Sequence, residues 1–274
     1  ELLIDSVEKQ LVSDVPVGSF LSGGIDSSLV TAIASTLKKD KIKTFSIGYD
    51  SAKYDESEHA LKVAKHLGTD HHAFKLTEDG VEEILSDIIF HYDEPFADAS
   101  AYPTMIVSKL ARQHVTVTLS GDGADELFLG YGMYNWASRL ANPIVQTFRK
   151  PVYWATQYAN LTYKRGGLLL DYPSLEHVRT HIFSQEQYFH SEQDLKHLLL
   201  DEKFNFDRIN QEIKTDKRIL NPKSKQSFWD INYYLKDDLL VKVDRASMKY
   251  SLESRVPYLD HRVIEYAINI DADL

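Results

Sequence analysis

A short run of small and polar residues, Ser22-Gly23-Gly24-Ile25-Asp26-Ser27-Ser28, stands between an apolar segment and an apolar helical pattern. The segment at 16–21 predicts a buried strand, and the pattern that follows repeats Leu29, Ile33 and Leu37 at a spacing of four, beside Val30 and Ala34. Glycines let backbone amides approach a phosphate closely, serine hydroxyls add donors, and the amino end of a helix contributes a positive dipole. The run therefore predicts an anion site at a turn between a strand and a helix.

The aspartate in this run determines which chemistry the turn can do. A P-loop carries a lysine that reaches the outer phosphates of a nucleotide, whereas this run has no lysine and contains Asp26. A carboxylate repels a phosphate unless a divalent cation lies between them, so we expect Mg²⁺ to bridge Asp26 and the phosphates. A second carboxylate is needed to hold such an ion, and Asp125 is the candidate, with Asp122 and Glu126 close to it in the sequence.

A second stretch, "VTVTLSGDGADELF" at 115–128, repeats the order of strand, glycine turn and helix. Further strands are expected at 41–49 and 71–76, and helices at 1–14, 55–68, 81–95 and 104–114. This alternation predicts an α/β fold, a Rossmann-like parallel sheet flanked by helices, with an additional helical region. Both glycine turns follow strands, so we expect them at the carboxyl edge of the sheet, where ligands bind at the switch point between neighbouring strands.

The chain has 274 residues, of which 43% are hydrophobic and 26% charged, enough for one large or two small globular domains. It has no cysteine, which excludes disulfides, a thiol nucleophile and a thiolate metal site and favours a cytoplasmic location. A net charge of -10 argues against a nucleic-acid partner, and the apolar runs are too short for a membrane span. The chain begins at Glu1 rather than Met, so we expect it to be part of a longer protein.

Three segments are expected along the chain: a nucleotide-binding α/β part at 1–134, a helical insertion at 135–227, and a helical return segment at 228–274 that completes the site. The polar sequence at 221–225 is expected to be a loop, and 228–270 to be helical with an interruption at Pro257.

Several polar residues have ordinary structural interpretations. Adjacent residues of a strand point to opposite faces, so His71 and His72 are interpreted as one core and one surface histidine without a functional role. Asp237 is interpreted as part of a solvated helix face. For Lys242, Asp244 and Arg245, a solvated face and a role in the site remain open alternatives.

The motifs together carry a resemblance to a known family. "SGGIDSS" resembles the pyrophosphate loop of the ATP pyrophosphatase group. Its combination with "FSIGY", "HLGTDHH", "DEPFADASAYPT", "LSGDGADELFLGY" and "DRASMKYSLESRVPYLDHR" resembles the synthetase domain of the asparagine synthetase B family. The resemblance covers residues 1–134 and about 228–270, and it implies an adenine nucleotide α-hydrolase-like fold.

The resemblance implies an ATP-dependent amide ligase in which aspartate is adenylated and ammonia then displaces AMP to give asparagine. It implies that Mg²⁺ is held by Asp26 and Asp125. The implied pyrophosphate-binding residues are Ser22, Gly23, Gly24, Asp26, Ser27 and Ser28, and those lining the adenosine pocket are Leu21, Ile47, Ser120 and Gly121.

Two catalytic residues are also implied. The family commonly has glutamate at the third position of Ser-Gly-Glu-Gly, beside the ammonia and the adenylate, and this chain has the shorter Asp122. Arg245 would position the substrate carboxylate or the α-phosphate, because a guanidinium can grip either bidentately. Arg255 belongs to the same signature and could also tie helices together with Asp260.

The implied partners are the small molecules aspartate and ammonia, with a glutaminase domain upstream in the same polypeptide that obtains ammonia from glutamine. A homodimer is compatible with the resemblance. Two alternatives remain: a related amide- or β-lactam-forming synthetase that adenylates another carboxylate, and a catalytically silent nucleotide-binding module.

Overall fold

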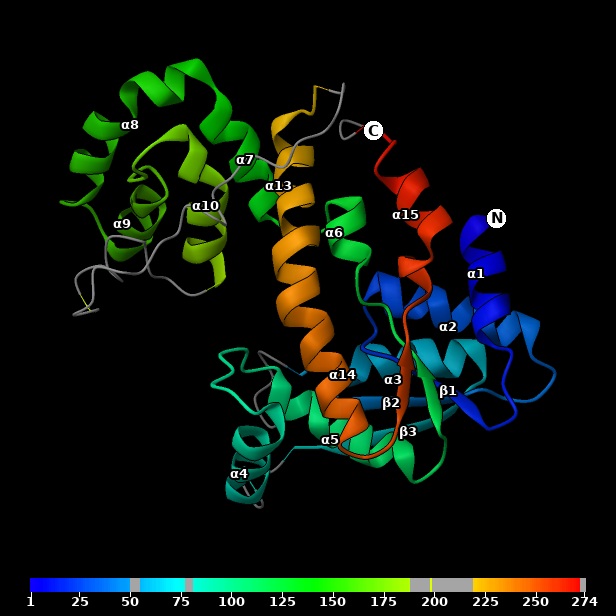
Figure 1. Cartoon of the computed structure of the whole chain (residues 1–274). Helices are drawn as coiled ribbons and strands as arrows, with labels where there is room; N and C mark the ends of the chain where they lie inside the picture. Colours follow the sequence, from blue (N-terminus) through cyan, green and yellow to red (C-terminus); the bar gives the residue numbers. More distant parts are fainter. Residues whose placement is uncertain (50–54, 77–80, 188–197, 199–218, 272–274) are drawn as a thin grey trace. The chain divides into compact units, whose positions relative to one another are not determined.

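The computed structural model describes residues 1–49, 55–76, 81–187, 198 and 219–271 (Figure 1). The chain divides into two compact units. The first consists of Glu1–Ala124 and Tyr234–Asn269, and the second of Asp125–Tyr233 and Ile270–Leu274. The first unit is called the sheet unit below, and the second the helical unit.

The sheet unit contains a parallel sheet of five strands in the order β3-β2-β1-β4-β5. The strands are β1 (Val17–Phe20), β2 (Lys43–Gly48), β3 (Asp70–Lys75), β4 (Val117–Leu119) and β5 (Glu253–Arg255). The four strands predicted from the sequence are all present. The parallel α/β fold is therefore confirmed, and its strand order places β1 at the centre, between β2 and β4.

Helices cover both faces of this sheet, as the right-handed connections between parallel strands require. In Figure 1, α2 (Ile25–Leu37) and α3 (Ser57–Leu67) lie on one side of the strands and α5 (Ala101–Arg112) on the other. The described part of the sheet unit also contains α1 (Leu2–Gln10), α4 (Val81–Tyr92), α14 (Leu240–Met248), the 3₁₀ turn η3 (Pro257–Leu259) and α15 (His261–Ala267).

Apolar side chains on the two sheet faces form separate clusters. Phe45 of β2 packs with Ala111 and Leu252 in one cluster, and Leu21 packs with Ala60 and Ala64 of α3 in another. The buried residues of α2 are Val30, Thr31 and Ala34, whereas Leu29 is 44% and Leu37 39% exposed. The helix was predicted correctly, but its buried stripe runs through Val30 and Ala34 rather than through the leucines.

Residues 221–255 differ in secondary structure from the prediction. The segment at 221–225 was predicted as a loop, but Asn221 caps the amino end of α13 (Pro222–Asp230) by accepting a hydrogen bond from Ser224 N at 2.8 Å. A π-helix, η2 (Ile231–Leu239), joins α13 to α14. Residues 253–255 were expected to be helical and instead form β5, whose three residues pair with β4. A strand this short has no sequence periodicity of its own, so the neighbouring strand decides its conformation.

The interpretation of the two histidines was wrong, because both are half-buried. His71 binds the hydroxyls of Thr44 at 2.9 Å and Ser46 at 3.2 Å through its two ring nitrogens. On the other face of β3, the ring of His72 stacks on that of His114 with centroids 4.0 Å apart. Polar and aromatic neighbours at the amino end of the sheet therefore accommodate both rings.

The helical unit contains α7 (Met133–Ala141), α8 (Pro143–Thr156), α9 (Leu161–Leu168), η1 (Leu175–His177), α10 (Val178–Gln187) and α13. Helix α6 (Ala124–Phe128) begins at its boundary. Tyr134, Leu140 and Ile182 form the centre of its core. The described part of the predicted helical insertion is thus helical, while 188–197 and 199–218 lie outside the described residues.

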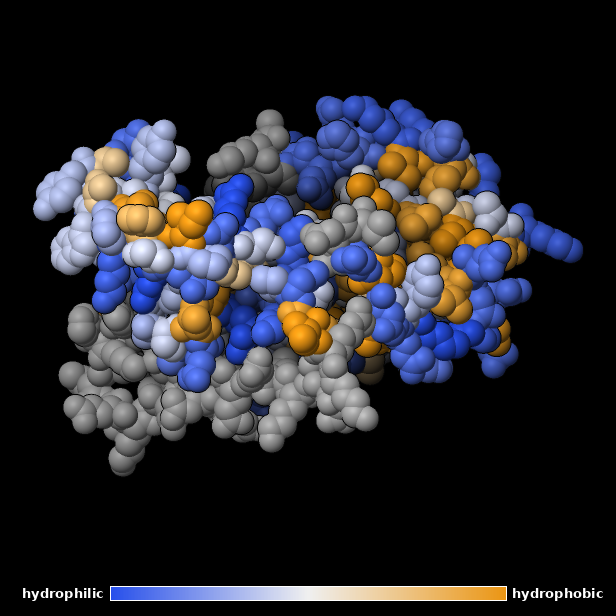
Figure 2. Space-filling view, turned by 90° about the horizontal axis from the view of Figure 1, so that it is seen from above, coloured by the Kyte–Doolittle hydropathy of each residue, from blue (hydrophilic) through white to orange (hydrophobic). Residues whose placement is uncertain are grey.

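On the face shown in Figure 2, separate groups of hydrophobic residues lie among hydrophilic ones. No helix among the described residues combines the length and the apolar character that a membrane span needs.

Candidate functional site

The two glycine turns follow neighbouring strands. Strands β1 and β4 pair directly, with Ser19 opposite Leu119, so the loops that begin at Ser22 and Ser120 leave the same edge of the sheet. The chain moves from β1 to β2 and β3 on one side, and continues with β4 and β5 on the other. The loops therefore lie at the switch point of the sheet, where open α/β folds bind ligands.

The first loop is held in a defined shape by its own serines. The hydroxyls of Ser22 and Ser27 lie 2.9 Å apart, and the amide of Gly24 donates to Ser22 Oγ at 3.2 Å. Gly23 has a φ of +87°, and a Cβ there would stand 2.5 Å from the backbone nitrogen of Ala60. Only glycine fits this position, since a side chain would be strained and would clash with the first turn of α3.

Helix α2 begins within this loop, with Gly24 as its N-cap and no side-chain cap bond. Glycine has no side chain that could accept a hydrogen bond from the backbone amides of the first turn, so Gly24 leaves these amides uncapped. The hydroxyl oxygen of Ser28 is buried and has no hydrogen-bond partner in the part of the chain that the structure describes. The amide groups and this hydroxyl are suited to binding the oxygens of an anion.

Asp26 projects from the first turn of the same helix and is partly buried. Burial raises the pKa of its carboxyl above the usual value, which is the effect expected where little positive charge compensates a partly desolvated carboxylate. Mg²⁺ prefers carboxylate oxygens and keeps substrate phosphates and waters among its ligands. Among the described residues, no group of three or more acidic or histidine side chains could hold a metal ion, and the binding of Mg²⁺ by Asp26 stays a prediction.

The second loop packs against the first. A Cβ on Gly121 would stand 2.9 Å from the backbone nitrogen of Ser27, so the absence of a side chain allows the two loops to approach this closely. Ser120 donates its hydroxyl to the carboxylate of Asp122, and its amide donates to the carbonyl of Arg255 on β5 at 2.8 Å. The structure therefore brings together Ser27, Gly121 and their neighbours, which the sequence assigned to pyrophosphate and adenosine.

The two apolar residues expected beside adenosine occupy different environments. The side chain of Leu21 is only 1% exposed and packs in the core with α3, while its amide donates to Phe45 O at 2.9 Å. Ile47 is half-buried near the carboxyl end of β2, paired with Phe74. Their contact with adenosine stays a prediction.

Asp125 belongs to the helical unit, whereas Asp26 belongs to the sheet unit. Within its unit, Asp125 folds back on the chain, because its Oδ1 would lie 1.9 Å from a Cβ on Gly130. The adjacent Glu126 is fully buried, accepts a hydrogen bond from Tyr131 Oη at 2.8 Å, and receives Ser227 Oγ on its carbonyl at 2.7 Å. These bonds fix α6 within the helical unit, and a shared Mg²⁺ stays a prediction.

Two cations of α14 bind the segment between α4 and α5. Lys242 is 7% exposed, and its ammonium donates to Asp98 Oδ2 at 2.8 Å and Ser100 Oγ at 2.7 Å. Burial raises the pKa of Asp98, but the ion pair with Lys242 and the hydrogen bonds from Lys242 and Ser100 outweigh it and hold the pKa below its usual value. Lys242 is thus part of a buried ion pair rather than of a solvated helix face.

Arg245 donates to the carbonyl of Tyr92 and to Glu94 Oε1, the latter at 3.2 Å, and its side chain is 35% exposed. Arg245 therefore binds the start of the segment between α4 and α5, and Lys242 binds the end of the same segment. The sequence assigned no role to Asp98 or Ser100, although both lie in the quoted stretch "DEPFADASAYPT". The available signal was a single carboxylate and a single hydroxyl, Asp98 and Ser100, alternating with alanines at 97, 99 and 101.

Arg255 and Asp260, which were expected to contact one another, each bind other residues. Arg255 donates to the carbonyls of Gln10 at 2.6 Å and Val12 at 2.8 Å, and to Glu253 at 2.7 Å. Asp260 is bound by Arg262 instead. Arg255 therefore ties the β5 segment to the end of α1.

The family model for asparagine synthase matches residues 1–274, which is the whole chain. The chain belongs to the asparagine synthase family. Asparagine synthetase [glutamine-hydrolyzing] 1 of Bacillus subtilis (strain 168) is 33% identical over 278 residues, covering 100% of this chain and 43% of the relative. A putative asparagine synthetase [glutamine-hydrolyzing] of Mycobacterium tuberculosis (strain H37Rv) is 32% identical over 282 residues, covering 99% and 42%.

Another similar protein is putative asparagine synthetase [glutamine-hydrolyzing] 2 of Methanocaldococcus jannaschii, 47% identical over 132 residues, which are 48% of this chain and 25% of the relative. The chain thus spans less than half the length of these curated relatives.

One cavity of the chain is lined by none of the predicted site residues. It has a volume of about 220 Å³, lies within the helical unit, and is lined by Ala137, Leu140, Leu175, Val178, Lys225 and Gln226 among others. None of its lining residues was assigned to nucleotide or metal.

Proposed function

We propose that this chain is the synthetase part of a glutamine-hydrolysing asparagine synthetase. It binds ATP, transfers AMP to the side-chain carboxylate of aspartate, and allows ammonia to complete the amide. The observation that carries the proposal is the close packing of Gly121 on the backbone amide of Ser27, where two glycine loops meet at the switch point of the sheet.

The reaction has two steps that balance without a redox partner. A side-chain carboxylate oxygen of aspartate attacks the α-phosphorus of ATP, the bond from that phosphorus to the bridging oxygen breaks, and pyrophosphate leaves with the electron pair. Ammonia then attacks the acyl carbon, gives up a proton, and displaces AMP to leave asparagine.

The chain's own residues would act chiefly on the leaving pyrophosphate. The amides at the start of α2 and the hydroxyls of Ser22, Ser27 and Ser28 would hold its oxygens, where negative charge develops. Asp26, with Asp125 as the second expected ligand, would hold Mg²⁺, which when bound neutralises part of that charge. This assignment explains a phosphate loop that contains a carboxylate and no lysine.

Asp122 and Arg245 are proposed to act on the other substrate. Asp122 lies on the second loop and is oriented by the hydroxyl of Ser120, which suits a group that contacts ammonia or the adenylate. Arg245 would position the aspartate carboxylate or the α-phosphate. Glutamine is proposed as the source of ammonia in the longer protein, through an upstream glutaminase domain, because the curated relatives are named glutamine-hydrolysing and are more than twice as long.

The test is to incubate the full-length protein with ATP, Mg²⁺, ammonia and a panel of carboxylates, and to measure AMP and ADP. Aspartate-dependent release of AMP and pyrophosphate, with asparagine as the product, is expected. AMP release with a different carboxylate would support a related amide- or β-lactam-forming synthetase. Nucleotide binding without AMP release from any carboxylate would support a silent binding module.

A further inference from the structure

The segment from Arg255 to Arg262, called the brace segment below, connects the first helix of the chain to both glycine loops. It leaves β5, passes through η3, and enters α15. This segment and its partners on α1 and on the two loops all belong to the sheet unit. The inference drawn from it rests on the proposed function, because it concerns the loops that are proposed to bind ATP.

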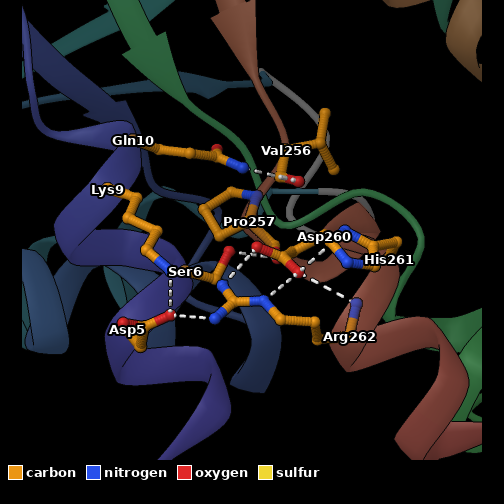
Figure 3. A network of polar contacts seen from close by, with 9 residues as sticks. All are labelled: Asp5, Ser6, Lys9, Gln10, Val256, Pro257, Asp260, His261 and Arg262. Atoms are coloured by element: carbon orange, nitrogen blue, oxygen red, sulfur yellow. Dashed lines mark hydrogen bonds and ion pairs between the residues drawn. The ribbon is translucent and has the colours of Figure 1, made fainter.

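The carboxyl end of the brace segment is fixed by an ion cluster built on Asp5, Asp260 and Arg262, in which Lys9 of α1 also pairs with Asp5 at 2.8 Å (Figure 3). Arg262 donates to Asp260 through two nitrogens, Nε at 2.9 Å and Nη2 at 2.7 Å, and its Nη1 contacts Asp5 of α1. Asp260 also accepts the amide of Arg262 at 2.9 Å, which caps α15. The hydrogen bond from Arg262 holds the pKa of Asp260 at about 2, so this cluster is charged at neutral pH.

Helix α1 also holds the middle of the brace segment. The buried hydroxyl of Ser6 donates to Pro257 O at 2.7 Å, and Gln10 Nε2 donates to Val256 O at 3.4 Å. In Figure 3 these donors project from the same helix as Asp5 and face the brace segment. Successive turns of α1 therefore bind carbonyl and charged groups along consecutive parts of the segment.

The side chains of η3 then contact the two loops. Tyr258 is 3% exposed and lies with its hydroxyl 3.5 Å from the carbonyl of Asp26. Leu259 fills the space beside Gly123, since a Cβ on that glycine would stand 2.5 Å from Leu259 Cδ2. One short turn thus packs against the helix start that carries Asp26 and against the loop that carries Asp122.

We infer that Arg262 is a positioning residue for nucleotide binding, and that it acts by holding η3 so that Tyr258 and Leu259 set the spacing of the two glycine loops. Loss of the cluster frees the brace segment from α1 at its carboxyl end. The loops then sample wider separations, and the fraction of molecules with the binding geometry falls. The expected consequence is weaker ATP binding by a side chain that does not itself contact ATP.

The experiment measures ATP affinity in Mg²⁺ by calorimetry on the full-length protein, together with the midpoint of urea unfolding. Arg262→Met is expected to raise the Kd for ATP about fivefold, and Arg262→Lys to recover part of the loss. The matched control is Lys249→Met, which breaks the Lys249–Asp87 ion pair of the same unit, 2.8 Å long and also partly exposed. The control is expected to lower the urea midpoint by a similar amount and to change the Kd less than twofold.

A second variant with a smaller change keeps the inference testable if Arg262→Met does not fold. Asp5→Asn leaves the Asp260–Arg262 pair intact, and it is expected to raise the Kd about twofold to threefold. An unchanged Kd in Arg262→Met and Asp5→Asn, or equal losses in Arg262→Met and Lys249→Met, would overturn the inference. Absence of ATP binding by the unsubstituted protein would overturn the proposed function, and this inference with it.

Discussion

A Cβ on Gly121 would stand 2.9 Å from the backbone nitrogen of Ser27 and 3.2 Å from the carbonyl carbon of Asp26. These are backbone atoms, which cannot rotate away as the end of a flexible side chain can. Glycine at this position is therefore what permits the loop after β4 to touch the start of α2.

Gly121→Ala is accordingly expected to push the two loops apart and to raise the Kd for ATP about tenfold, which corresponds to about 1.4 kcal/mol. Gly132→Ala is the control, because nothing lies within 4 Å of a Cβ at that position. Calorimetry with ATP and Mg²⁺ measures both. An alanine at 121 that binds ATP like the unsubstituted protein would show that the contact between the loops does not matter for the nucleotide.

Asp26→Asn is expected to weaken ATP binding in Mg²⁺ about tenfold or more, while AMP binding changes less than about threefold. The reason is that AMP lacks the phosphates that the ion is proposed to bridge to Asp26. Asparagine has nearly the same shape, and burial already raises the pKa of Asp26, so the fold should tolerate the neutral side chain. Equal losses for both nucleotides would identify Asp26 as structural.

Asp122→Ala is expected to abolish most amide formation while the Kd for ATP changes less than about threefold, or about 0.7 kcal/mol. Asp122 is bound by the hydroxyl of Ser120, so Ser120→Ala should lower the rate less, by disorienting the carboxylate without removing it. Product formation and calorimetry are measured on the same preparations. A large loss of ATP affinity in Asp122→Ala would instead assign Asp122 to the metal.

Lys242→Met is expected to lower the free energy of unfolding by about 3–5 kcal/mol, because it leaves the carboxylate of Asp98 buried without its cation. Combining it with Asp98→Asn should cost less than the sum of the single changes. Lys236→Met is the control: its ion pair with Asp237 has side chains 64% and 60% exposed, and such a pair contributes at most about 1 kcal/mol. Urea unfolding measures all four variants, and additive losses would argue against the ion pair.

The histidines near the amino end of the sheet predict a loss of stability in mild acid. Burial lowers the pKa of His71 and of His114, and the neighbouring His72 lowers both further. Protons therefore bind the unfolded chain more tightly, so stability is present above the ordinary histidine pKa of about 6.5 and falls as the pH drops below it.

The measurement is the urea midpoint at pH 7.5 and pH 5.5. His114→Gln should reduce the difference between the two, because it removes one of two stacked rings. His66→Gln, on the exposed side of α3, should leave the difference unchanged. A midpoint that does not fall at pH 5.5, or falls equally in His114→Gln, would contradict the assignment to this cluster.

The sequence by itself determined the parallel sheet and the two loops. Strand, glycine turn and helix follow one another at 16–37 and again at 115–128, and each of these signals depends only on residues close together in the chain. The strict requirement for glycine at positions 23 and 121 was decided by the fold instead, because the backbone atoms that exclude a side chain there belong to Ala60 and Ser27. The expectation that Asp26 and a second carboxylate, Asp125, bind Mg²⁺ followed from the charges of carboxylates and phosphates alone. It stays a prediction for the experiments above.

The tertiary structure decided the remaining features. Strand β5 has three residues and no periodicity, and it exists because β4 offers a free edge for it. The burial of Lys242 depends on Asp98, 144 positions away, and the ion cluster joins Asp5 to Arg262 across almost the entire chain. The sequence does not show which partner a charged side chain will have. The fold decides whether that side chain is solvated, forms an ion pair or positions another segment, because it brings distant parts of the chain together.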